Sequence, residues 1–241
     1  MSNMRKKNDG KIRDVDIRLA FMKRNIKFFE QEGMEFVNEF GINKTNICDL
    51  AAFDFNHIDA EGKKDPIFYG FEIKSEMDNT KRLYKQLNSY ITFFNVVYVI
   101  CHKKHTEEVT RIIEKAKQFD RIGLIEVDEH LNFTELKKAR RYKPVYSMFI
   151  SNLDLEELRD LAIEFGLPTD GNKSTLLGKL RRYTNMSKIY EGIHNKLRKY
   201  YIRTCPNCGS KLYYKTGSNR GGIDRVCFKC KHKSSFKYFY D

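Results

Sequence analysis

The stretch from residue 67 to residue 127 alternates apolar runs with segments of helical periodicity, and this order restricts the fold most strongly. Three apolar runs predict strands, and the two segments between them place apolar residues at helical spacing: 67–75, 96–101 and 122–127 for the strands, 79–94 and 106–119 for the helices. Strand–helix–strand units form right-handed crossovers between parallel strands. We therefore expect an α/β domain with a mixed sheet flanked by helices, ending near residue 150.

The segment before this alternation predicts one helix and one further strand. Residues 12–40 have apolar positions at helical spacing, and residues 47–53 form a buried strand pattern. A polar turn separates that strand from 67–75, so the two are expected to form a hairpin. Asp78 is expected to cap the helix that begins near Asn79.

Three charged residues interrupt the two strands of the expected hairpin. Asp49 lies within one apolar strand, and Glu72 and Lys74 lie two residues apart on the next. Side chains alternate between the faces of a strand, so Glu72 and Lys74 project the same way and Asp49 can meet them. Two carboxylates beside a lysine suit a Mg²⁺-dependent phosphodiesterase, because Mg²⁺ prefers oxygen ligands and activates bound water. The alternative is an ordinary ion pair of Lys74 with Glu72 or Asp49.

Residues 39–101 resemble the PD-(D/E)XK nuclease superfamily, specifically its small bacterial and phage branch. The residues that carry the resemblance are Glu39 late in the first helix, Asp49 in NICDLAAF, the strand GFEIKS, and Asp78, Arg82, Leu83 and Gln86 in the next helix. Cys48 occupies the position of the proline in the superfamily's name. The resemblance implies a restriction-endonuclease-like core.

The resemblance also implies roles for individual residues. The ligands of a catalytic Mg²⁺ or Mn²⁺ ion would be the side chains of Asp49 and Glu72 and the backbone carbonyl of Ile73. Lys74 would be the catalytic lysine. Residues in supporting positions would be Glu39, which binds or supports a metal from the first helix, and Gln86 and Arg82, which position the substrate or the active-site acids.

Residues 152–183 resemble a SAP-type helix–loop–helix, a small DNA-binding module. The resemblance rests on leucines at 155, 158 and 161, then Gly166-Leu167, Gly171-x-Lys173 and Leu176-Leu177. The expected phosphate contacts come from the second helix and its N-terminus: Lys173, Lys179, Arg181 and Arg182. The alternative is a plain helical hairpin that packs on the preceding domain.

Four of the six cysteines form two CxxC pairs near the C-terminus. Cys205 and Cys208 are separated from Cys227 and Cys230 by eighteen residues, which suits two knuckles around a tetrahedral Zn²⁺ ion. A closed site of four thiolates predicts structural zinc in a zinc ribbon, with strands around Tyr213, Tyr214, Val226 and 236–240. The basic residues of the ribbon favour contact with nucleic acid: Arg203, Lys211 and Arg220, mixed with aromatic residues that can stack on bases.

Positive charge is concentrated at the C-terminal end of the chain. Residues 186–241 contain 13 Lys and Arg and 3 acidic residues, so they carry +10 of the net charge of +13. A polyanionic partner follows, most simply nucleic acid, because basic side chains that neutralise phosphates release counterions. We expect four parts: 1–150 as the nuclease-like domain, 151–185 as the SAP-like module, 186–202 as a basic helical connector and 203–241 as the zinc ribbon.

The leading hypothesis is a Mg²⁺- or Mn²⁺-dependent nuclease that cuts DNA during bacterial or phage DNA processing, repair or defence. The alternatives are a catalytically inactive nucleic-acid-binding accessory protein and an adaptor or inhibitor that binds another protein. No apolar run reaches the roughly 18 residues of a membrane span, so we expect a cytoplasmic protein. The sequence leaves open DNA against RNA, and whether the chain forms a homodimer or joins a larger DNA-processing complex.

Overall fold

The computed structural model describes most of the first 182 residues and part of the C-terminal module. The described residues are 10–42, 46–62, 65–116, 119–142, 150–151, 153, 155–182, 205, 207–209, 213–219, 222–227 and 229–235. Predictions for the connector at 186–202, for Arg203, Lys211 and Arg220, and for a strand at 236–240 lie outside these residues.

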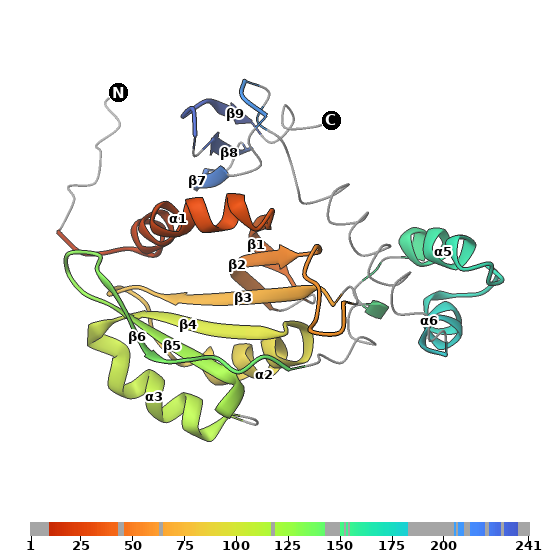
Figure 1. Cartoon of the computed structure of the whole chain (residues 1–241), viewed down its shortest axis with the longest axis horizontal. Coiled ribbons are helices and arrows are strands. Elements are labelled where there is room, and N and C mark those ends of the chain that lie inside the picture. Colours follow the sequence, from red (N-terminus) through yellow and green to blue (C-terminus); the bar gives the residue numbers. More distant parts are fainter. Residues whose placement is uncertain are drawn as a thin grey trace.

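A mixed sheet of six strands forms the centre of the larger part (Figure 1). Its strands follow one another in chain order: β1 (Glu35–Gly41), β2 (Ile47–Asp54), β3 (Ile67–Lys74), β4 (Val96–His102), β5 (Ile122–Val127) and β6 (Phe133–Lys137). β1, β2 and β3 are antiparallel, β3, β4 and β5 are parallel, and β6 returns antiparallel to β5. The expected α/β class with a mixed sheet flanked by helices is confirmed.

Helices cover both faces of this sheet (Figure 1). α1 (Asp14–Gln31) covers one face, where Ile17 and Phe21 pack with residues such as Phe71. α2 (Leu83–Phe93) and α3 (Thr106–Lys115) cover the other face, and two 3₁₀ turns, η1 (Lys103–His105) and η2 (Phe119–Arg121), flank α3. Each parallel strand is therefore buried on both sides, which explains its unbroken apolar sequence.

The prediction of one helix over residues 12–40 is wrong in its second half. α1 ends at Gln31, and Gly33 takes a left-handed backbone conformation with φ of +63°. Glycine adopts this conformation without steric cost, so the chain can reverse there and enter β1. The strand β6 was not predicted, because most of its side chains are exposed and give no apolar alternation.

Asp78 does not cap the following helix as predicted. Its Oδ2 atom accepts hydrogen bonds from the backbone N–H of Ser75 at 2.8 Å and from the Ser75 hydroxyl at 2.7 Å. α2 begins only at Leu83, and the side chain at its N-cap position, Arg82, makes no capping hydrogen bond. Asp78 therefore fixes the turn that follows β3 and not the start of the helix.

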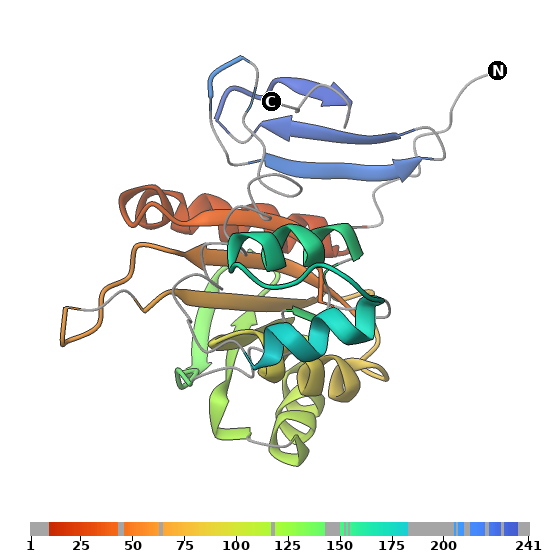
Figure 2. The same ribbon diagram turned by 90° about the vertical axis from the view of Figure 1, so that its right-hand side faces the viewer.

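Two short helices follow the sheet, α5 (Leu155–Glu164) and α6 (Lys173–Arg181), and they lie side by side (Figure 2). α5 ends in a Schellman motif: Gly166, with φ of +66°, donates to the carbonyl of Ile163, and Leu167 donates to that of Ala162. The buried leucines of the pair continue the core on the α2 and α3 face of the sheet. A helix–loop–helix is present as expected, and it packs onto the α/β core.

The C-terminal module contains a three-stranded antiparallel sheet (Figure 2). Its strands are β7 (Tyr213–Asn219), β8 (Gly222–Cys227) and β9 (Lys233–Ser235), in that order. The strands expected around Tyr213 and Val226 are present. In the part of the chain that the structure describes, no helix is long and apolar enough to cross a bilayer.

Candidate functional site

The sheet opens between β2 and β3 at the position of Asp49. The paired register of the two strands runs from Asp54 opposite Ile67 to Leu50 opposite Phe71. Beyond that pair, Oδ2 of Asp49 accepts a hydrogen bond of 2.7 Å from the backbone N–H of Ile73. A carboxylate thus stands where the backbone of β2 would otherwise pair with β3.

Glu72 and Lys74 lie on the α2 face of β3 and form a buried ion pair. The Nζ atom of Lys74 is 2.6 Å from Oε1 of Glu72, and the exposed fractions of the two residues are 7% and 1%. From α2, Oε1 of Gln86 lies 3.4 Å from the same Nζ atom. The predicted residues Glu72, Lys74 and Gln86 are therefore in contact.

Tyr90 of α2 completes the surroundings of Glu72 and was not found from the sequence. Its hydroxyl lies 2.8 Å from the carbonyl oxygen of Ile47 and in hydrogen-bond contact with Oε2 of Glu72. Burial and the nearby acidic groups raise the pKa of Tyr90 well above its usual value, so the hydroxyl keeps its proton. In the sequence Tyr90 is one of several apolar-face residues of its helix, which gives no sign of this contact.

The carboxyl group of Asp49 has a strongly shifted pKa. Burial, followed by repulsion from Glu72, raises the pKa of Asp49 from 3.8 to about 7. The hydrogen bond from Ile73 and the charges of Arg18 and Lys74 act in the opposite direction. Two carboxylates held this closely favour an additional cation, and their oxygen atoms are the ligands that Mg²⁺ and Mn²⁺ prefer.

Arg18 of α1 is a second cation beside Asp49 that the sequence did not single out. It is only 6% exposed, and its NH2 atom lies 2.8 Å from Oδ2 of Asp14. The one available sign was its position on the apolar face of the helix, between Ile17 and Phe21. A buried guanidinium is costly without charged partners, and the acidic groups around Arg18 provide them.

Glu39 reaches this region from a strand and not from the first helix, which corrects the prediction. It lies on β1 with φ of +54°, and its Oε1 atom is 3.8 Å from NH1 of Arg18. The neighbouring pairs, Asn38 with Leu50 and Phe40 with Cys48, place Glu39 across from Asp49. Glu39 is thus beside the cluster, joined to it through Arg18. Arg82, also expected to support the site, is exposed at the N-cap position of α2.

The four C-terminal cysteines form a compact group. Their Sγ atoms all lie within 4.8 Å of one another. Among the residues that the structure describes, this is the group of three or more His, Cys, Asp or Glu side chains that lie close enough together to hold a metal ion. The Sγ atoms of Cys205 and Cys230 are 3.6 Å apart, and those of Cys208 and Cys227 are 3.5 Å apart. A tetrahedral site with Zn–S bonds of about 2.3 Å has sulfur atoms about 3.8 Å apart, so the group fits Zn²⁺.

The backbone on both sides of this group repeats the same turn. The N–H of Gly209 donates to the carbonyl of Cys205 at 2.8 Å, and that of Lys231 donates to Cys227 at 3.0 Å. Gly209 and Lys231 each follow the second cysteine of a pair, and each has a positive φ, +67° and +60°. Two matching knuckles aim the four sulfur atoms at one point, so this group can hold a structural metal.

The basic residues of the helical pair differ in what they contact. Lys179 donates to Oδ1 of Asp170 at 2.8 Å and also contacts the carbonyl oxygens of Pro168 and Asp170, so it holds the loop between the helices. Arg181 and Arg182 are exposed, and Lys173 is half-buried at the start of α6. Lys179 therefore has a structural role in addition to any contact with phosphate.

Comparison with known proteins gives a phage family. The family model described as Bacteriophage P4 protein cII matches residues 34–215, which include β1 to β6, the helical pair and the first CxxC pair. Protein cII of Enterobacteria phage P4 is 28% identical in an alignment of 152 residues that covers 59% of this chain and 54% of that protein. The chain therefore spans about half the length of this relative.

One solved structure is also similar in part. It is the SPO1766 protein of unknown function from Silicibacter pomeroyi, with 14% sequence identity and a TM-score of 0.33. The match covers 58% of this chain and 86% of that one. Likeness at this level carries no argument about fold or function.

Proposed function

The chain belongs to the bacteriophage P4 protein cII family, and from this premise we propose that it is a phage-type protein that hydrolyses phosphodiester bonds in DNA. The name of the family assigns no activity, so the chemistry rests on the site. The observation that carries it is the buried Lys74–Glu72 pair, with its 2.6 Å contact, beside the carboxylate of Asp49. Carboxylates can hold a divalent metal ion and a lysine can stabilise charge on a phosphate, so this arrangement at the opening between two strands supports metal-dependent phosphodiester cleavage.

The residues of the cluster fit a divalent cation. Asp49 and Glu72 supply carboxylate oxygens, and the raised pKa of Asp49 reflects a negative charge that a cation would stabilise. A bound Mg²⁺ or Mn²⁺ ion would lower the pKa of a water ligand and stabilise charge on phosphoryl oxygens. By resemblance, the backbone carbonyl of Ile73 is the expected third protein ligand.

The other residues position the charged groups. Gln86 and Glu72 hold the ammonium of Lys74, which then faces the region where negative charge develops on the phosphate. Tyr90 fixes the carboxylate of Glu72 from α2. Arg18, on the α1 side of Asp49, adds a guanidinium that suits a phosphate oxygen.

A nucleic-acid-binding protein without catalysis is the second candidate, and one observation favours it. Both carboxylate oxygens of Glu72 already have partners within the chain, Lys74 on Oε1 and Tyr90 on Oε2. A cluster satisfied in this way is stable without a metal ion, as expected of a retained fold that only binds. Membership of the phage family adds no support for catalysis, and the basic C-terminal region calls only for binding, so both agree better with this second candidate.

One comparison separates the two candidates. Wild type, Lys74→Ala and the control Lys81→Ala, an exposed lysine nearby, are incubated with single-stranded, duplex and branched DNA and with RNA, in Mg²⁺, Mn²⁺ or EDTA. The nuclease predicts cleavage that is lost in EDTA and in Lys74→Ala but retained in Lys81→Ala. Retarded migration of nucleic acid without metal-dependent cleavage of any substrate would establish the second candidate.

A further inference from the structure

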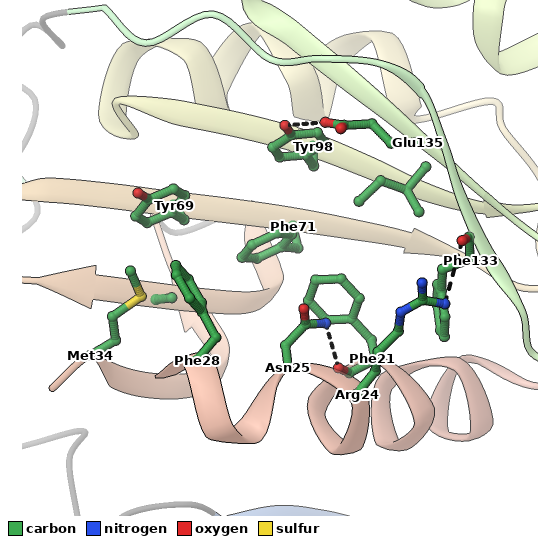
Figure 3. Close-up of a pocket in the computed structure, with 12 residues that line it drawn as sticks. Phe21, Arg24, Asn25, Phe28, Met34, Tyr69, Phe71, Tyr98, Phe133 and Glu135 are labelled. Carbon is green, nitrogen blue, oxygen red and sulfur yellow. Dashed lines mark hydrogen bonds between the residues drawn. The ribbon is translucent and has the colours of Figure 1, made fainter. Parts of the chain in front are cut away.

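A cavity of about 370 Å³ lies between α1 and the sheet, on the face opposite Lys74 and Glu72 (Figure 3). Phe71 lines it, and because neighbouring residues of a strand point to opposite faces, Glu72 points away from it. The carboxylate cluster therefore does not account for this cavity. Its volume is in the range of small-ligand pockets, which begin at about 300 Å³.

The sheet side of the cavity is a row of three aromatic rings. Tyr69 and Phe71 of β3 have ring centroids 6.5 Å apart and planes 9° from parallel, and Phe71 and Tyr98 are 6.1 Å apart at 13°. Gly123 of β5 permits this arrangement, because a Cβ atom there would lie 2.3 Å from the Tyr98 ring. The aligned rings give one wall of the cavity a π surface on which a planar ligand can stack.

The opposite side of the cavity combines another ring with polar groups from α1 (Figure 3). Phe28 is 51% exposed, so an aromatic ring stands at the edge of the cavity. Asn25 donates its Nδ2 hydrogen to the carbonyl of Phe21 at 2.8 Å, which orients its side-chain amide. Arg24 lies one residue before it and rests over the ring of Phe133 at 5.9 Å.

A carboxylate also lines the cavity. Glu135 of β6 accepts a 2.6 Å hydrogen bond from the hydroxyl of Tyr98 on Oε1. Burial, followed by this hydrogen bond, raises the pKa of Tyr98 to about 12, so the tyrosine remains a donor at neutral pH. The carboxylate is thereby held at the rim, where it can accept from an amino group of a ligand.

We propose that this cavity binds a nucleobase. The row of rings would stack on the base, the amide of Asn25 and the carboxylate of Glu135 would bond to its polar edge, and Arg24 would pair with a phosphate. A saturated acyl chain would leave these three polar groups unused. The same chemistry is offered by an unpaired base of a strand and by a free nucleotide, and binding does not require the cleavage proposed above.

The test uses a single-stranded DNA 12-mer that carries one 2-aminopurine, whose fluorescence falls when the base stacks. Titrations are made in EDTA with wild type, Phe28→Ala and Phe119→Ala, a matched control because both phenylalanines are 51% exposed and Phe119 does not line the cavity. We expect quenching by wild type, binding about ten-fold weaker for Phe28→Ala, and no change for Phe119→Ala. No quenching, or equal binding by the three proteins, would overturn the proposal.

Two further arms identify the source of the base and separate this proposal from catalysis. Adenosine monophosphate is added as a competitor. If the cavity binds free nucleotides, the competitor displaces the DNA and the fluorescence recovers; if it binds only a base within a strand, the quenching persists. Either result supports the site when Phe28→Ala weakens binding. Because the titrations are made in EDTA, quenching observed there is independent of metal-dependent cleavage. Asn25→Leu, which keeps the size of the side chain, should also weaken binding, and full affinity in this variant would contradict the hydrogen-bonding part of the proposal.

Discussion

Lys74 and Glu72 form a buried ion pair on β3, with 2.6 Å between Nζ and Oε1. Gln86 and Tyr90 of α2 contact the two ends of this pair, so a helix and a strand fix its geometry together. A buried charge is strongly destabilising when its partner is removed, because desolvation is no longer compensated. The pair therefore contributes to folding as well as to the proposed chemistry, and the two contributions can be measured separately.

Removing one partner of the pair should destabilise the protein more than removing both. Lys74→Met leaves Glu72 buried without its cation, and we expect the free energy of unfolding to fall by about 3–5 kcal/mol. The double variant Glu72→Gln with Lys74→Met should recover most of this loss. Urea unfolding followed by circular dichroism gives both values, and a single variant as stable as wild type would show that the pair is open to water.

Asp49 should make the stability of the metal-free protein fall as pH rises. The pKa of its carboxyl is raised from 3.8 to about 7 by burial and by Glu72, so between these values the folded state holds a proton that the unfolded state has lost. Stability from this group is therefore present below pH 4 and is lost as pH rises through 7. In EDTA, Asp49→Asn should lose less stability than wild type between pH 5 and pH 8.

Magnesium should reverse this effect in wild type far more than in Asp49→Asn. A cation bound to the ionised carboxylates of the folded state stabilises it by an amount that grows with the logarithm of the cation concentration, so the unfolding midpoint of wild type at pH 8 should rise with Mg²⁺ concentration. Asp49→Asn removes one of the proposed ligands and should respond much less. An equal response of the two proteins would place the ion elsewhere.

Two glycines of the helical pair should respond in opposite directions to alanine. Gly171 has φ of +103°, and a Cβ atom there would lie 2.8 Å from Thr175, so Gly171→Ala should destabilise the protein by about 1–3 kcal/mol. Gly178 lies within α6, where an added Cβ atom would meet nothing within 4 Å outside the helix's own backbone, so Gly178→Ala should stabilise the protein by about 0.5–1 kcal/mol. Thermal unfolding of the two variants checks this pair, and effects of the same sign would contradict the loop geometry.

The four cysteines should hold one Zn²⁺ ion per chain. Elemental analysis of protein purified without chelator measures the content, and release by a thiol-blocking reagent can be followed with a metal-sensitive dye. Cys227→Ser should lower the content to near zero, because the site then lacks one of four thiolates. Cys48→Ser, which changes a buried cysteine of the sheet, is the control and should keep the zinc. Native protein without zinc would remove the assignment.

The alternation of strands and helices was predictable because each parallel strand is buried on both faces and reads as an apolar run. β1 was missed because residues 34–40 have apolar positions that also suit a helix, and only the conformation of Gly33 separates the two. β6 was missed because an exposed edge strand leaves no hydrophobic pattern.

Some contacts of the candidate site were also predictable from the sequence, and others were not. Glu72 and Lys74 were placed on one face by strand alternation, and the hairpin register brings Asp49 to them. The contacts of Tyr90 and Arg18 depend on how α2 and α1 dock on the sheet, so local sequence does not encode them. Glu39 was assigned to the first helix because the apolar positions of residues 34–40 also suit a helix, although Glu35–Gly41 form β1.

The initial rate of Mg²⁺-dependent DNA cleavage, compared between Glu72→Gln and Glu76→Gln, tests the nuclease proposal most directly. Both variants change one carboxylate to an amide close to β3, but Glu76 accepts a hydrogen bond from the backbone of Ile12 and lies outside the cluster. We predict that wild type and Glu76→Gln cleave at similar rates and that Glu72→Gln is slower by about two orders of magnitude or more. Cleavage by Glu72→Gln at the wild-type rate, or none by folded, zinc-loaded wild type that still binds DNA, would contradict it.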